Sequence, residues 1–130
     1  MEKIYDVTAL GEMLIDFAVN GESEQGNQLF EACPGGAPCN VLAFLQKMEK
    51  KTAFIGKVGN DHYGDFFRKN LQKNNIEDNL LTSEHLPSGV ASAFISPDGE
   101  RTFGTYLGAA ASLKAEDLTL EMFKGYAYLF

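Results

Sequence analysis

The sequence lacks the features that would place it among the nucleic-acid-binding or membrane proteins. Its 130 residues include 11 Lys and Arg against 18 Asp and Glu, a net charge of −7, and no stretch forms a basic stripe. This balance argues against binding of a phosphate backbone. No apolar run approaches the length of a membrane span, and the N-terminus has no basic-plus-apolar signal segment. We therefore predict a cytoplasmic protein that binds neither nucleic acid nor membrane.

Cysteine is also scarce, with only Cys33 and Cys39 present. Secreted scaffolds that depend on disulfides are far richer in cysteine, and no histidine lies near this pair to complete a zinc site. We interpret the two as reduced thiols, with a local disulfide as the alternative. The sequence has no internal repeat and no low-complexity tract, and its 45% of hydrophobic residues suffice for the core of one domain.

The chain is organised around residues 33–40, Cys-Pro-Gly-Gly-Ala-Pro-Cys-Asn. Gly35 and Gly36 allow the backbone to turn with positive φ or to come close to a ligand, and apolar residues at helical spacing follow. The start of a helix offers free N–H groups, and the Asn40 side chain can both donate and accept hydrogen bonds. A polyhydroxylated ligand needs such a mixed polar surface. The alternative is an ordinary tight turn before a core helix.

Strands alternate with helices along the first half of the chain, which predicts βαβ units and a mostly parallel sheet. The second half is typical of an antiparallel hairpin around the turn at residues 97–99. Residues 108–112 are expected to form a hinge or loop of small residues. The expected strands are 5–10, 13–19, 28–32, 52–58, 90–96, 101–107 and 126–130, and the expected helices are 38–47, 61–73 and a short one within 115–123.

Three motifs, in this order, resemble the N-terminal signature of the ribokinase-like (PfkB) carbohydrate kinases. They are Gly-Glu-Met-Leu-Ile-Asp at 11–16, the Gly-Gly-x-x-x-Asn helix start at 35–40, and Gly-x-x-Gly-x-Asp-x-x-Gly at 56–64. The resemblance implies an α/β fold with a mostly parallel sheet and a small β-sheet lid over the sugar. The lid strands would fall at about 12–32 and 89–107, and the remainder would begin the large α/β domain.

The same resemblance implies a set of sugar contacts. A carboxylate can accept hydrogen bonds from two neighbouring hydroxyls, and an amide can donate and accept at once. For Asp16, a solvated carboxylate in a strand is the alternative interpretation. The implied substrate-binding residues are Asp16, Gly35, Gly36 and Asn40, with the aromatic residues Phe103 and Tyr106 of the second lid hairpin.

The phosphate-binding half of such a kinase is not recognisable in this sequence. The family carries its catalytic aspartate and anion hole in a Gly-Ala-Gly-Asp turn, and residues 108–112, Gly-Ala-Ala-Ala-Ser, contain no aspartate. A Gly-x-x-x-x-Gly-Lys-Ser/Thr loop is missing as well. We therefore expect the N-terminal, sugar-binding part of a longer kinase, with no catalytic residue and no metal ligand of its own. ATP and Mg²⁺ would bind the other part, and the 130-residue chain alone would be inactive.

Within the family, residues 12–17 and 34–43 resemble fructokinases, whereas residues 96–110 resemble the adenosine-kinase-like branch. Leu107 stands where fructokinases usually have an arginine, a forked donor for substrate oxygens. Residues 48–49, Met-Glu, replace a common Leu-Gly and are expected to alter only the helix exit. The function predicted is that of a fructokinase; the alternatives are a nucleoside kinase and a non-catalytic ligand-binding or dimerising fragment. A homodimer through the lid sheet is a further hypothesis.

Overall fold

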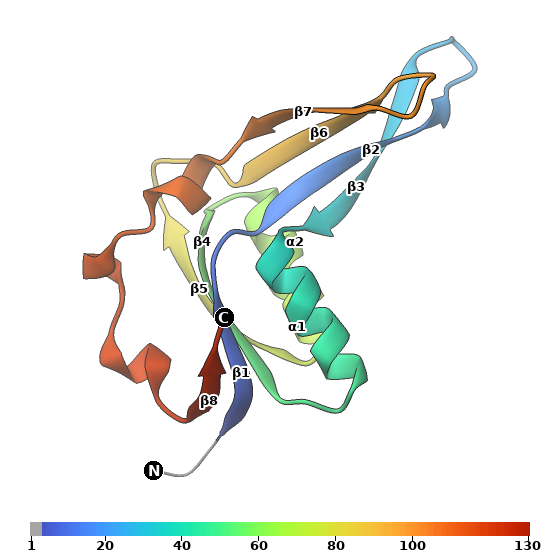
Figure 1. The fold of residues 1–130 in the computed structure, drawn as a ribbon. Coiled ribbons are helices and arrows are strands. Elements are labelled where there is room, and N and C mark those ends of the chain that lie inside the picture. The colour runs from blue at the N-terminus through green and yellow to red at the C-terminus, as the bar shows by residue number, and fades with distance from the viewer. Residues whose placement is uncertain (1–3) are drawn as a thin grey trace.

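The computed structural model describes residues 4–130, and one of its two four-stranded sheets is built from parallel strands (Figure 1). Sheet A has the strand order β5-β4-β1-β8, and every neighbouring pair in it runs parallel. The prediction of a mostly parallel sheet is thus confirmed. The strands of sheet A are β1 (Tyr5–Leu10), β4 (Thr52–Gly59), β5 (Ile76–Ser83) and β8 (Tyr126–Leu129).

The other four-stranded sheet, sheet B, projects from sheet A like an arm (Figure 1). Its strand order is β3-β2-β6-β7, with antiparallel pairs at β2–β3 and β6–β7 and a parallel pair at β2–β6. The hairpin around residues 97–99 and the small second sheet are confirmed, although β2 and β3 are longer than expected. The strands of sheet B are β2 (Leu14–Glu22), β3 (Gln28–Gly35), β6 (Gly89–Ile95) and β7 (Arg101–Tyr106).

Sheet A is covered on its two faces by different kinds of structure (Figure 1). The helices α1 (Ala37–Lys47) and α2 (His62–Lys73) lie on one face. The 3-10 helices η1 (Gly108–Ser112), η2 (Ala115–Asp117) and η3 (Leu120–Phe123) follow one another on the opposite side. No helix among residues 4–130 is both long and apolar enough to cross a membrane.

The segment that was expected to be a hinge, residues 108–112, is instead the helix η1, which packs against β4. Its Ala109 is fully buried, and the Ala109 N–H donates to the Pro87 carbonyl over 2.8 Å. Small side chains permit this close packing, so the expectation of a hinge was wrong. The segment fixes the exit of the second hairpin onto sheet A.

The core lies between sheet A and the two α-helices. Phe54 of β4, Leu42 of α1 and Phe67 of α2 are fully buried there. Ile15, near the start of β2, is also fully buried, so the base of sheet B belongs to the same core. Burying each such side chain contributes about 1.5–3 kcal/mol relative to leaving it exposed. This packing sets where the base of the arm meets the carboxyl ends of the parallel strands.

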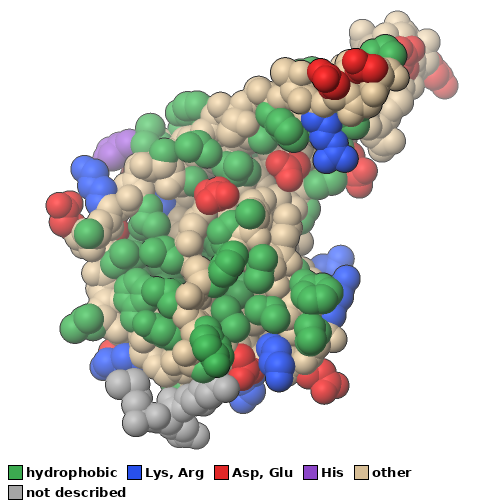
Figure 2. All heavy atoms as spheres, viewed as in Figure 1, with side chains coloured by type: hydrophobic (Ala, Val, Ile, Leu, Met, Phe, Trp, Pro, Cys, Tyr) green, Lys and Arg blue, Asp and Glu red, His purple; other side chains and the backbone are tan. Residues whose placement is uncertain are grey.

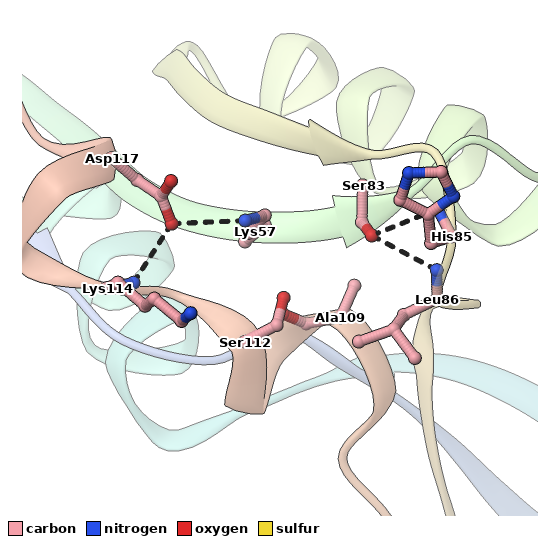
Figure 3. A network of polar contacts seen from close by, with 8 residues as sticks. All are labelled: Lys57, Ser83, His85, Leu86, Ala109, Ser112, Lys114 and Asp117. Atoms are coloured by element: carbon pink, nitrogen blue, oxygen red, sulfur yellow. Dashed lines mark hydrogen bonds and ion pairs between the residues drawn. The ribbon is translucent and has the colours of Figure 1, made fainter.

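Polar contacts hold the irregular segment after η1 against β4 (Figure 3). The Lys57 ammonium of β4 donates to the Asp117 carboxylate over 3.0 Å, and the Lys114 backbone N–H donates to the same oxygen over 3.0 Å. Hydrogen bonds from the Lys114 backbone and from the Lys57 side chain hold the pKa of Asp117 below its usual range. The region of residues 113–119 is therefore tied to the sheet by one carboxylate.

A testable strain lies at the exit of α1, where Glu49 has φ 60°. A left-handed backbone conformation costs an L-residue about 1–2 kcal/mol and glycine almost nothing. Glycine also loses more chain entropy on folding, which offsets part of this gain. The net expectation is that Glu49→Gly stabilises the protein by about 0.5–1 kcal/mol. Chemical denaturation measures this. Glu24→Gly, in an exposed turn without positive φ, is the matched control and should be neutral or destabilising.

Candidate functional site

The turn that joins β3 to α1 requires glycine at two positions. Gly36 has φ 108°, and a Cβ atom placed there would lie 2.4 Å from the backbone oxygen of Glu12. No other residue fits both the conformation and the space. One turn further, the Asn40 N–H donates to the Gly36 carbonyl over 3.1 Å, and the Asn40 side chain is exposed in the first turn of α1. The sequence prediction of a helix start at the double glycine is confirmed.

Asp16 lies directly against this turn. A Cβ atom on Gly35 would lie 2.0 Å from Asp16 Oδ2, so the missing side chain of Gly35 is the space that the carboxylate occupies. In sheet B, Asp16 pairs with Cys33 of β3 and Ala91 of β6. Burial raises the pKa of the Asp16 carboxyl above its ordinary value. The structure therefore brings together Asp16, Gly35 and Gly36, as expected from the sequence.

The two aromatic candidates lie on opposite faces of sheet B. Paired residues share a face, and the face alternates along a strand. Phe103 pairs with Ala93, which pairs with Ala18, two residues from Asp16. Phe103 thus shares the face of Asp16. Tyr106 pairs with Val90, which pairs with the core residue Ile15, so Tyr106 lies on the other face. The six residues named from the sequence therefore do not converge on one surface.

Two small residues on the face that carries Asp16 were not singled out by the sequence reasoning. Ala91 lies beside Asp16, and Thr105 of β7 pairs with Ala91. Small residues leave room for a ligand over the sheet, and a threonine hydroxyl can donate and accept. Strand alternation would have found these residues, but only with the register of β2 against β6, which crosses 75 residues of sequence.

A cavity of about 480 Å³ adjoins the same turn. Gly11 and Glu12, which follow β1, form one wall of it, and Leu107 forms part of another. The Glu12 backbone also packs against Gly36, so the cavity and the glycine turn share a boundary. Its volume lies within the range of small-molecule sites. The complete lining is Gly11, Glu12, Leu107, Ala110, Ala111 and Leu113.

The third sequence motif, at 56–64, has a structural role. Asp61 caps α2 by accepting from the Gly64 N–H over 2.8 Å. Its carboxylate also accepts from the Ser88 N–H and the Ser88 hydroxyl, each over 2.7 Å, and Ser88 Oγ accepts from the Gly59 N–H over 2.9 Å. One side chain thus joins the end of β4, the start of α2 and the start of β6. The motif positions sheet B against sheet A.

The cysteines and histidines form no site in the part of the chain that the structure describes. Cys33 and Cys39 are free thiols, as predicted. Burial raises the pKa of the Cys39 thiol to about 11, so it stays protonated at neutral pH. Within residues 4–130, no group of three or more His, Cys, Asp and Glu could hold a metal ion. The polar surface around Asp16 is therefore the candidate functional site.

Comparison with known proteins identifies the family of this chain. Residues 5–126 match the model described as pfkB family carbohydrate kinase. The chain belongs to this family. It is 34% identical over 123 residues to the probable fructokinase-3 of Arabidopsis thaliana, and 40% identical over 101 residues to the probable fructokinase-7 of the same plant. These matches cover 91% and 75% of this chain but only 36% and 29% of the relatives, so the chain spans about a third of their length.

Solved structures agree with the family assignment. The fructokinase of Xylella fastidiosa superposes with a TM-score of 0.85 at 24% identity, over 95% of this chain and 39% of that one. A sugar kinase from Pyrococcus horikoshii, solved in complex with ATP, gives a TM-score of 0.83 at 26% identity, over 95% of this chain and 41% of that one. The ribokinase-like fold predicted from the sequence is confirmed. This pfkB domain is thus a partial one.

Proposed function

We propose that this pfkB chain is the sugar-binding part of an ATP-dependent carbohydrate kinase whose substrate is fructose. The carbohydrate-kinase family and the fructokinase relatives support this proposal. The observation that carries it is the carboxylate of Asp16 held over Gly35, with the small side chain of Ala91 beside it on the next strand. The proposed sugar contacts are Asp16, Gly35, Gly36, Asn40 and Phe103, with Ala91 and Thr105 as added neighbours.

The chemistry of Asp16 suits a sugar. An ionised carboxylate accepts hydrogen bonds from two adjacent hydroxyls, and each bond to a charged group contributes roughly 1.5–3 kcal/mol. Sheet B, standing over the carboxyl ends of sheet A, would act as the lid. Closing it would exclude water from a hydroxyl that is to receive a phosphoryl group.

ATP and Mg²⁺ are assigned to the part of the kinase that relatives have beyond the match. The described residues form no cluster that fits a magnesium ion, and the chain has no phosphate-binding glycine loop of the Gly-x-x-x-x-Gly-Lys-Ser/Thr type. In this proposal the described residues hold and orient the sugar, and we assign them no step of phosphoryl transfer. Bound ATP with Mg²⁺ would supply the transferable phosphoryl group.

Titration with fructose tests the proposed function. In ¹⁵N-labelled protein, fructose is expected to shift the amide signals of Gly35, Gly36 and Asn40 in a saturable way. The same protein with ATP, Mg²⁺ and fructose should form no sugar phosphate, because the base and the anion hole lie elsewhere. Absence of any saturable shift up to the highest soluble fructose concentration contradicts the proposal. Turnover that Asp16→Ala abolishes contradicts the assignment of catalysis to the other part.

Leu107 provides a sharper prediction about the sugar. It lines the cavity beside Glu12. The resemblance to fructokinases implies an arginine at this position. Leu107→Arg places a forked donor there, which is expected to tighten fructose binding about tenfold, since a charged hydrogen bond outweighs the ordering of the side chain. Leu107→Lys supplies the charge without the fork and should gain less. Equal or weaker binding by the arginine variant would exclude fructose oxygens from this wall of the cavity.

We further propose that sheet B carries the surface for a second copy of the chain. Val19, Phe30 and Phe94 lie in one row on the face opposite Asp16 and are each more than 40% exposed, and the rings of Phe30 and Phe94 meet edge to face at 6.4 Å. Exposed apolar rows of this kind favour association. We place the proposed homodimer interface there, which light scattering on a Phe94→Ser variant checks.

A further inference from the structure

A second cavity, the α2 groove, lies between α2 and the end of β3 (Figure 1). Its volume is about 420 Å³, within the range of small-molecule sites. Pro34 pairs with Ile15, the chain neighbour of Asp16, so strand alternation puts Pro34 on the face of sheet B opposite Asp16. The groove is thus separate from the proposed sugar site. Its lining is Pro34, Phe66, Lys69, Asn70 and Lys73.

One face of α2 supplies most of this lining. Its four residues, at positions 66, 69, 70 and 73, recur at spacings of three and four and therefore form one stripe along the helix. Phe66 is half-buried and packs against the core, and its ring meets the Phe67 ring edge to face at 6.2 Å. The groove therefore has a fixed aromatic wall in Phe66 and a second apolar wall in Pro34.

The polar part of the lining consists of hydrogen-bond donors. Lys69 and Lys73 are exposed, and neither forms an ion pair with a carboxylate of residues 4–130. Two like charges four residues apart on a helix repel each other. The Asn70 side-chain oxygen accepts from Asn74 Nδ2 over 3.4 Å, whereas Asn70 Nδ2 donates no hydrogen bond within the described part of the chain. The groove thus offers two ammonium groups and an amide without an acceptor.

The local charge of the groove is opposite to that of the chain. The net charge of the protein is −7, yet the described lining contains no acidic residue. Figure 2 shows basic side chains beside the helices below sheet B, whereas acidic side chains gather at the tip of the arm. An anion in the groove would relieve the repulsion between Lys69 and Lys73.

We propose that the α2 groove binds a small phosphomonoester that carries a flat apolar ring. A phosphate group carries about −1.5 to −2 charges at neutral pH and three acceptor oxygens, which match the two ammonium groups and the Asn70 amide. A carboxylate offers only one charge and two oxygens. The ring of the ligand packs against Phe66 and Pro34, since aromatic rings favour offset or edge-to-face contacts. This second ligand lies beyond the proposed sugar-binding function.

Titration with phenyl phosphate tests the groove. In ¹⁵N-labelled protein, the amide signals of Phe66, Asn70 and Lys73 are expected to shift in a saturable way. Phenyl phosphate should bind at least about tenfold more tightly than inorganic phosphate or phenol, because each of these has only half of the recognised chemistry. Benzoate should bind at least about fivefold more weakly than phenyl phosphate, since it carries less charge and one oxygen fewer.

Substitutions in the groove locate the contacts. Lys69→Gln and Lys73→Gln should each weaken the binding of phenyl phosphate by about five- to tenfold, through loss of a charged hydrogen bond. Lys47→Gln, which removes a cation from the last turn of α1, is the matched control for Lys73 and should leave binding unchanged. Phe66→Leu should reduce the affinity for phenyl phosphate to that for inorganic phosphate. The amide spectrum of each variant checks its fold.

The remaining outcomes overturn the proposal. They are no saturable shift at the groove, equal affinity for phenyl phosphate and inorganic phosphate, and binding that neither lysine variant weakens. Displacement of phenyl phosphate by fructose would place the ring in the sugar site, and tighter binding of benzoate would make the groove a carboxylate site. The titration needs no fructose binding, so its result is independent of the test of the sugar site.

Discussion

Replacing Asp16 by alanine is expected to weaken fructose binding by at least about 10²-fold. The carboxylate would accept hydrogen bonds from two hydroxyls, each contributing roughly 1.5–3 kcal/mol, and 1.4 kcal/mol corresponds to a factor of ten. Asp16→Asn keeps the shape but removes the charge and turns one acceptor into a donor, so it should lose nearly as much. The saturable shifts at Gly35, Gly36 and Asn40 in the fructose titration measure both variants.

The pH dependence of binding follows from the same residue. Burial raises the pKa of Asp16, and the ionised form is the one that binds. As pH falls, binding is therefore lost at a higher pH than an ordinary aspartate, with a pKa of about 3.9, would give. Glu31→Gln, which changes an exposed carboxylate of β3 on the same face, is the control. A variant at Asp16 that binds within threefold of the parent would mean that the carboxylate is structural.

Much of the fold could be predicted from the sequence, because the signals are local. Gly35 and Gly36 mark a helix start independently of the rest of the chain, and the alternation of strands and helices predicts parallel pairing. The strand β5 was missed. In its sequence, Ile is followed by Glu-Asp-Asn, which are residue types depleted in strands. The strand forms because it pairs with β4 and because Arg68 neutralises Asp78.

The candidate site could be predicted only in part, for the same physical reason. A family signature implied that Asp16 and Gly35 belong to one site, but which hairpin residues share the face of Asp16 depends on the register of β2 against β6. Alternation along β7 alone separates Phe103 from Tyr106, but the register decides that Phe103 shares the face of Asp16 and adds Ala91 and Thr105. Register is a tertiary property, since a shift by one residue reverses the face of every side chain.

The motif at 56–64 illustrates what a signature leaves out. From the sequence it served only to recognise the family, whereas in the structure its Asp61 joins the start of α2 to Ser88, before β6, with hydrogen bonds of 2.7–2.8 Å. The position of sheet B over the candidate site therefore depends on a residue 45 positions from Asp16. Asp61 is thus both part of the motif that identifies the family and the side chain that holds sheet B in position.

Asp61→Ala is accordingly expected to destabilise the protein by about 2–4 kcal/mol. It removes a helix cap, which contributes about 0.5–2 kcal/mol, and leaves the Ser88 N–H and hydroxyl without their charged acceptor. The melting temperature should fall by roughly 10 °C. Asp65→Ala, an exposed acid in the first turn of the same helix, shares the dipole effect but not the hydrogen bonds and should cost less than about 1 kcal/mol.

Acid should remove the same stability. Burial alone would raise the pKa of Asp61, but hydrogen bonds from Ser88 and Gly64 outweigh it and hold the pKa below its ordinary value. A carboxylate whose pKa is lower in the folded state stabilises the protein above its unfolded pKa of about 3.9 and loses this contribution as pH falls through the folded value. The difference in unfolding free energy between the parent and Asp61→Asn should therefore be constant near neutral pH and shrink below about pH 4. A difference that grows on acidification would show that Asp61 is not held as the ionised acceptor that joins sheet B to sheet A.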